Sequence, residues 1–112
     1  MLKVTIDYQN QDIKGFMVKG HANYAPEGQD ICCAGVSAIT QTALMGLINH
    51  LEKKPVFKVE KGDLEVSLAE DISVEDNNKA QIILNTMLAG IESLQENYRS
   101  YIKVEFRRCK NV

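Results

Sequence analysis

The sequence predicts an α+β fold, a single-domain α/β sandwich in which a mainly antiparallel sheet carries two long helices. Five short segments alternate apolar and polar residues, which is typical of strands with one buried face. Two longer segments repeat apolar residues every three or four positions, which is typical of amphipathic helices. The order is strand, strand, helix, strand, strand, helix, strand. A chain of 112 residues is long enough for one core and too short for two, so one domain over residues 1–112 is expected.

The first two strands form a predicted hairpin. Apolar and polar residues alternate from Leu2 to Tyr8, the polar residues 9–12 favour a turn, and the segment from Ile13 to Gly20 returns as the second strand. The next segment, from Ala22 to Gln29, contains a proline and a glycine and has no sustained period. It is predicted to be a loop.

A long amphipathic helix is predicted to follow Asp30 and to run to about Lys53. Its apolar stripe consists of Val36, Ile39, Ala43, Leu47 and Leu51. Aspartate directly before a helix is a preferred N-cap, because its carboxylate accepts unpaired backbone N–H groups. Pro55 ends the helix, since the residue before a proline avoids the helical region.

A second hairpin is predicted after this helix. Its strands run from Val56 to Val59 and from Leu64 to Leu68, and the glycine-bearing residues 61–63 join them. The polar alternate residues of these strands are expected to face water.

A second helix and a last strand complete the predicted order. Ser73, followed three residues later by Asp76, resembles a capping box, and the apolar period continues from there to about Arg99. The alternation from Tyr101 to Phe106 predicts the last strand.

Composition excludes several classes of partner. With 13 basic and 15 acidic side chains, the chain has no field that would gather nucleic acid or an anionic membrane. We expect a cytoplasmic protein, because the N-terminus lacks a signal-peptide pattern and no apolar run approaches about 18 residues. The three cysteines include the neighbours Cys32 and Cys33, which favours reduced thiols over a disulfide framework. No cofactor is indicated.

Residues that can carry chemistry gather at the two ends of the predicted loop. His21 precedes it, and Cys33 follows it in the first turn of the predicted helix, where unpaired N–H groups and the helix dipole favour a thiolate. A histidine beside that thiol can accept its proton. Asp30 can orient the imidazole or cap the helix. Ser37, one turn after Cys33, can point at the same site or lie on the helix surface.

Other interpretations of the cysteines remain open on periodicity alone. Cys32 and Cys33 both fall on the apolar half of the helix, so Cys33 can also be a small buried hydrophobic residue. A zinc site is disfavoured, because neighbouring cysteines do not form a Cys-x-x-Cys unit and His50 and Cys109 are far away in sequence. A redox pair is disfavoured by the strain of a bridge between chain neighbours.

Two segments, Gly20-His21-Ala22 and the run from Gly28 to Ala38 that contains both central cysteines, resemble the signature of the bacterial ribosomal-processing cysteine protease family, Prp. The strand order and the segment from Ala80 to Leu88 also resemble the family. The resemblance implies a homodimeric cysteine endopeptidase that removes a short N-terminal extension from large-subunit ribosomal protein twenty-seven. Family members cut after a phenylalanine pair and before a small residue. The alternative is a non-enzymatic ribosome-assembly module that binds the same tail without cleaving it.

The resemblance also assigns roles to residues. The family's histidine falls on His21, and its nucleophilic cysteine falls on Cys33, which lies three places after Asp30. Gly20, Asp30 and Ser37 match family positions as supporting residues. Cys32 departs from the family pattern, because that place is usually aliphatic.

The same resemblance implies an apolar groove that holds an extended peptide beside the loop. Tyr24 is expected to line this groove. The loop is flanked by Gly20 and Gly28, which supply the permissive backbone that a closing lid needs near its ends. No metal is expected at the site.

Overall fold

The computed structural model describes residues 1–20 and 27–109, and within residues 27–30 it describes the backbone alone. The elements follow the predicted order, which confirms the α+β fold. They are β1 (Leu2–Gln9), β2 (Asp12–Lys19), α1 (Glu27–His50), β3 (Val56–Glu60), β4 (Asp63–Ser67), α2 (Val74–Asn97) and β5 (Ile102–Arg108).

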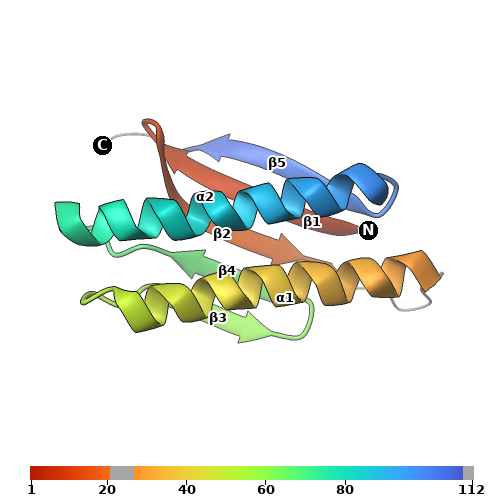
Figure 1. The fold of residues 1–112 in the computed structure, drawn as a ribbon, viewed down its shortest axis with the longest axis horizontal. Helices are drawn as coiled ribbons and strands as arrows, with labels where there is room; N and C mark the ends of the chain where they lie inside the picture. Colours follow the sequence, from red (N-terminus) through yellow and green to blue (C-terminus); the bar gives the residue numbers. More distant parts are fainter. Residues whose placement is uncertain (21–26, 110–112) are drawn as a thin grey trace.

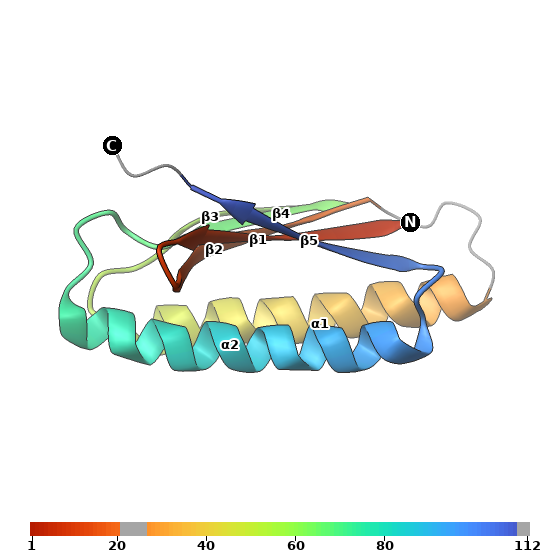
Figure 2. The same cartoon turned by 90° about the horizontal axis from the view of Figure 1, so that it is seen from above.

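The five strands form one sheet in the order β3-β4-β2-β1-β5. Three of the neighbouring pairs are antiparallel, and β1 and β5 are parallel. Both helices lie side by side on the same face of this sheet (Figures 1 and 2). Within the described chain no helix covers the opposite face, so the molecule has two layers and one core between them.

The core lies between the sheet and the helix pair, where the two periodicities meet. On β1 the alternating residues Leu2, Val4 and Ile6 are buried, as the period of two requires. On α1 the predicted stripe is buried at Val36, Ala43 and Leu47 and half-buried at Ile39. The amphipathic patterns therefore identified the inward faces of both layers.

The predicted start of the first helix is wrong. α1 already begins at Glu27, so Gly28, Gln29 and Asp30 lie inside the helix and not in the loop or at its cap. A proline directly before the first helical residue is compatible with a helix start, because the first N–H groups have no partner within the helix. Pro26 therefore does not exclude helix at residue 27, although in sequence it looks like a breaker.

The predicted end of α1 at Lys53 is also wrong, because the helix ends at His50. Two of the backbone N–H groups that follow donate to a side-chain acceptor instead of to carbonyls of the helix. The N–H groups of Glu52 and Lys53 donate to the Asp76 carboxylate at 3.3 and 3.0 Å. This buried carboxylate thus links the end of α1 to the first turn of α2.

Only half of the predicted capping box forms. The Ser73 hydroxyl accepts a hydrogen bond from the Asp76 N–H at 3.1 Å, which confirms Ser73 as the N-cap of α2. The Asp76 side chain does not complete the box, because it binds the segment after α1. The helix then ends at Asn97, two residues before the predicted Arg99.

We expect Asp76→Asn to lower the melting temperature at pH 7. The pKa of Asp76 lies below its ordinary value, chiefly because the Lys53 N–H donates to the carboxylate, and burial opposes this shift. A depressed pKa stabilises the fold above the unfolded value of about 3.9, and this contribution disappears as the pH falls through the folded value. In thermal melts from pH 7 to pH 2, the difference in melting temperature between Asp76→Asn and wild type should therefore become smaller as the pH falls. The matched control is Glu75→Gln in the same turn, with an 85% exposed side chain; a gap independent of pH would contradict the assignment.

The segment Ile31–His50 of α1 has the length and composition of a membrane-spanning helix, with a mean hydropathy of 1.7. The expectation that no such segment exists does not hold when hydropathy is averaged over the helix. The core helix of a globular protein passes the same test. Here Val36, Ala43 and Leu47 pack into the core beneath the sheet.

Candidate active site

Three of the residues singled out in the sequence lie on one cavity of about 140 Å³. Gly20 follows β2, Cys33 and Ser37 lie on one side of α1, and all three line this cavity. Its other wall comes from the hairpin of β3 and β4, including Val59, Glu60 and Gly62. Segments that are distant in sequence therefore meet around the Cys33 thiol.

The structure shows that the two adjacent cysteines have different environments, a difference that the sequence periodicity does not reveal. Cys32 is fully buried in the core, and burial raises the pKa of its thiol, with a smaller contribution from the nearby Cys33. Cys33 is half-buried and lines the cavity. A thiolate is the nucleophilic form of cysteine and needs access to its substrate. Of these neighbours, Cys33 is thus the one placed to act as a nucleophile.

The predicted position of Cys33 in the first helical turn is wrong. Because α1 begins at Glu27, Cys33 lies six residues further along, where backbone N–H groups bond to carbonyls of the preceding turn. The effect of the helix dipole falls off within the first turn. Unpaired N–H groups of the helix terminus therefore do not stabilise a thiolate at Cys33, contrary to the sequence-based expectation.

Gly20 is held in a conformation that a larger residue cannot share. Its φ is +104°, and a Cβ atom would lie 2.6 Å from the Met1 carbonyl oxygen. Its N–H donates to the Gly62 carbonyl at 3.1 Å. Gly62 itself has a φ of +76° in the turn between β3 and β4. These contacts fix the direction in which the chain leaves β2 at the cavity.

The remaining predicted site residues are placed only in part. His21 and Tyr24 lie outside the described residues. Gly28 and Asp30 lie within α1, and the structure describes only the backbone of both residues. Because Asp30 is three residues inside the helix, its predicted role as the N-cap is excluded.

Sequence reasoning missed the contribution of the second hairpin and of the next helical turns. Thr40, Gln41 and Asp63 also line the cavity. Gln41 lies two turns beyond Cys33 on the same side of the helix, so the spacing of four was an available signal. Asp63 accepts hydrogen bonds from Lys19 and Lys58, and these bonds, the one from Lys19 first, lower the pKa of its carboxyl. Nothing local in the sequence indicates that this cluster adjoins Cys33.

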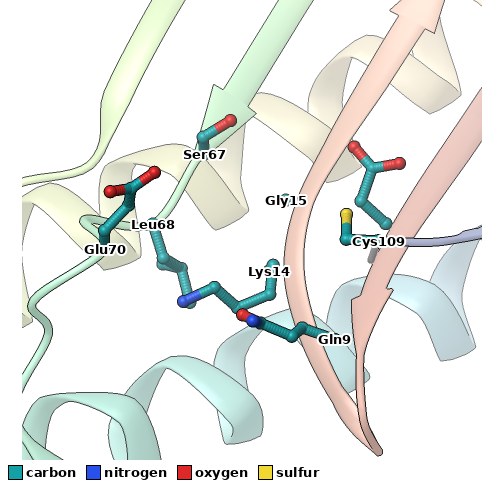
Figure 3. A pocket seen from close by; sticks show the side chains of 8 residues that line it. Gln9, Lys14, Gly15, Ser67, Leu68, Glu70 and Cys109 are labelled. Carbon is teal, nitrogen blue, oxygen red and sulfur yellow. The ribbon is translucent and has the colours of Figure 1, made fainter. Parts of the chain in front are cut away.

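A second cavity, of about 460 Å³, opens on the face of the sheet away from the helices (Figure 3). Its lining includes Lys14, Glu70 and the half-buried Cys109, and it shares no residue with the Cys33 cavity. In residues 1–20 and 27–109, no group of three or more histidine, cysteine, aspartate or glutamate side chains could hold a metal ion. The half-buried thiol of Cys33 and its cavity form the candidate active site.

Comparison with known proteins identifies the family. The sequence model described as cysteine protease Prp matches residues 1–103. The ribosomal processing cysteine protease Prp of Bacillus subtilis (strain 168) is 29% identical over 107 residues, which cover 93% of this chain and 96% of that protein. The Prp of Staphylococcus aureus (strain Mu50) is 28% identical over 108 residues, which cover 93% of this chain and 99% of that protein.

Solved structures share the fold of this chain. The crystal structure of Staphylococcus aureus Prp with a substrate peptide superimposes with a TM-score of 0.84 at 24% identity, covering 96% of this chain and 100% of that one. The structure of the same protease with a covalently linked product peptide has a TM-score of 0.80 at 25% identity, with the same coverage. The chain therefore belongs to the Prp family of cysteine proteases.

Proposed function

We propose that this single domain, residues 1–112, is an endopeptidase that removes the N-terminal extension of large-subunit ribosomal protein twenty-seven, with Cys33 as nucleophile and His21 as general base and acid. The observation that carries the assignment of residues is the shared cavity of Cys33 and Gly20, the residue directly before His21. Relatives named ribosomal processing proteases support the substrate class. A relative that holds a covalently linked product peptide supports covalent catalysis.

The proposed reaction follows from the chemistry of a thiol and an imidazole. His21 takes the proton from the Cys33 thiol, and the thiolate attacks the carbonyl carbon of the scissile peptide bond. As the C–N bond breaks, His21 gives the proton to the departing amine. Water then adds to the thioester, which releases the new carboxyl end and returns the proton to the enzyme.

The supporting residues have distinct proposed roles. Asp30 orients His21, since capping is excluded by its place inside α1. Ser37 presents its hydroxyl to the cavity. Gly20 sets the chain direction before His21. Tyr24 belongs to the proposed substrate loop, and Gly28 belongs to the first turn of α1, which follows that loop.

The decisive experiment uses a synthetic peptide that spans the extension and the first mature residues of the ribosomal protein. We expect the purified protein to cut one bond, detected by mass spectrometry, with no added cofactor. Tight binding of the peptide without any product would instead support the non-enzymatic assembly module.

The role of His21 is tested separately from turnover. If His21 accepts the thiol proton, iodoacetamide should label Cys33 near neutral pH faster than Cys109, and His21→Ala should lower the Cys33 rate by at least about tenfold. Peptide mapping of the labelled cysteines measures both rates in one sample. Equal Cys33 rates in the two proteins would contradict the proposed pairing.

We also propose a cytoplasmic homodimer that binds neither membrane nor nucleic acid. The support for a dimer is an apolar groove of about 600 Å³ between the outer sides of α1 and α2. Ile82 on its rim is 71% exposed. Sedimentation equilibrium should give twice the chain mass for wild type and the chain mass for Ile82→Lys.

A further inference from the structure

One of the strands that line the Cys33 cavity is an open sheet edge. β3 is the terminal strand and pairs only with β4 among the residues described. Three of its five side chains are large and apolar, and Val56, Phe57 and Val59 are 70%, 48% and 50% exposed. Proteins normally protect such an edge, because its unpaired backbone groups can bind another strand.

The hydrogen-bond register shows which backbone groups of β3 face the open side. Between β2 and β4, the Gly20 N–H donates to the Gly62 carbonyl at 3.1 Å and the Leu68 N–H to the Lys14 carbonyl at 2.9 Å. Hydrogen-bonded pairs alternate with non-bonded pairs along an antiparallel ladder. In the same register, Leu64 and Val66 therefore direct their backbone groups toward β2 and away from β3.

The residues of β3 opposite these two have no ladder partner on β4. Phe57 pairs with Val66 and Val59 with Leu64, both as non-bonded pairs. The N–H and C=O groups of Phe57 and Val59 therefore point to the open edge. Their side chains face the helix layer, because Leu64 and Val66 are buried there.

This edge leads directly to the thiol. α1 runs beside β3 in the opposite direction, so the end of β3 points toward the N-terminal half of α1 (Figure 1). Val59 and Glu60 line the cavity that contains Cys33. A neighbouring hollow on α1 shares Ser37 and Gln41 with this cavity and extends to Met45, which is 54% exposed.

We propose that the peptide substrate binds as an additional β-strand on the open edge of β3, with Phe57 and Val59 as its backbone partners. The proposal rests on the proposed endopeptidase function and locates its substrate site. Strand addition of this kind gives affinity through backbone bonds and specificity through alternate side chains. In this arrangement, every second side chain of the bound peptide lies over the surface that extends from Val59 and Gln41 to Met45.

The dimensions of the path fit a short extended segment. From Cys33 to Met45 the helix rises about 18 Å, at 1.5 Å per residue. A β-strand covers that length with about five residues, at about 3.3 Å each. A peptide of this size joins the exposed apolar side chains of β3 to the thiol, which explains why this edge is short, apolar and open.

A backbone scan of the substrate tests the proposal directly. Single N-methyl groups are placed in turn at each position of the synthetic peptide, on both sides of the cleaved bond, which removes one N–H at a time. On the side of the bond that pairs with β3, we expect methylation at every second position to lower kcat/KM at least about tenfold. Methylation at the positions between them should have little effect. The loss should come from a higher KM. A uniform or irregular profile on both sides of the bond would overturn the proposal.

A matched pair of enzyme variants tests the enzyme side of the proposed pairing, the backbone of β3. Val59→Pro removes the outward N–H without removing a bond to β4, whereas Val59→Thr keeps that N–H and the branched shape. We expect KM to rise at least about tenfold more in the proline variant than in the threonine variant, while both variants keep the circular dichroism spectrum and the Cys33 alkylation rate of wild type. Equal KM values for both variants would contradict strand pairing. Loss of dimer mass in Val59→Pro alone would also overturn the proposal, since a second copy then occupies this edge.

Failure of this proposal is distinguishable from failure of the proposed function. If wild type cleaves the peptide but the scan does not alternate, only the substrate site is wrong. If wild type does not cleave, the same N-methyl peptides are used in fluorescence anisotropy. An alternating pattern of Kd then supports strand addition, and a flat pattern or no binding excludes it.

Discussion

Cys33→Ala is expected to lower kcat for peptide cleavage by at least about a thousandfold, whereas Cys32→Ala keeps kcat within about threefold of wild type. The reason is the different placement of two adjacent thiols. Cys33 lines the cavity at the end of β3, so its sulfur can reach a peptide carbonyl. Cys32 is fully buried in the core, and its thiol pKa is raised, so it is neither accessible nor readily ionised.

The two cysteine variants also differ in stability. Cys32→Ala removes a buried sulfur and should lower the free energy of unfolding by about 1 kcal/mol, while Cys33→Ala should change it less. Progress curves with the synthetic peptide and urea unfolding of the same samples measure both effects. Retained cleavage by Cys33→Ala together with loss in Cys32→Ala would transfer the nucleophile to the neighbouring position.

Most of the fold was predictable because every described element except β3 has one buried face, whereas all five residues of β3 are exposed. Leu2, Val4 and Ile6 alternate in sequence as they alternate in the sheet, and the stripe of α1 matches the residues that pack beneath it. Ser73 marked the start of α2 because an N-cap depends on neighbouring residues only. These features are local, and a single sequence records them.

Helix boundaries were less predictable, because they depend on contacts between distant segments. The end of α1 is set by the Asp76 carboxylate, which lies on another helix and draws away the N–H groups of Glu52 and Lys53. Its start precedes the expected position because Pro26 and Gly28 act as breakers in the middle of a helix but are tolerated near its first turn.

The candidate site was likewise predictable where it depends on neighbouring residues and unpredictable where it depends on distant segments. The chain order predicted that Cys33 and Ser37 share one side of a helix, because a spacing of four is one turn. It did not predict that the hairpin of β3 and β4 forms the opposite wall, since Val59 and Gly62 meet the helix only after the sheet forms. Periodicity alone did not distinguish Cys32 from Cys33; the family resemblance favoured Cys33, and the packed structure shows that the two thiols differ in burial.

Gly20→Ala is expected to lower kcat/KM by about a hundredfold, the size of effect that a displacement of about 1 Å at a catalytic group produces. A Cβ at this position would lie 2.6 Å from the Met1 carbonyl oxygen, and the φ of +104° is unfavourable for any residue with a side chain. Relief of this strain requires the backbone to move at the point where it leaves β2. The hydrogen bond from the Gly20 N–H to the Gly62 carbonyl would then weaken, and the chain entering His21 would shift relative to Cys33.

The matched control for this substitution is Gly90→Ala. There the added Cβ would lie 3.5 Å from the nearest side-chain atom of Ile39, an ordinary van der Waals contact within α2. Alanine is the better helix former by about 1 kcal/mol, so Gly90→Ala should raise the melting temperature and leave kcat/KM unchanged. Gly20→Ala should lower both, because about 1–3 kcal/mol of backbone strain remains in the folded state. Wild-type activity in Gly20→Ala would mean that the exit of the chain from β2 does not position His21, and it would remove the link between this glycine and catalysis.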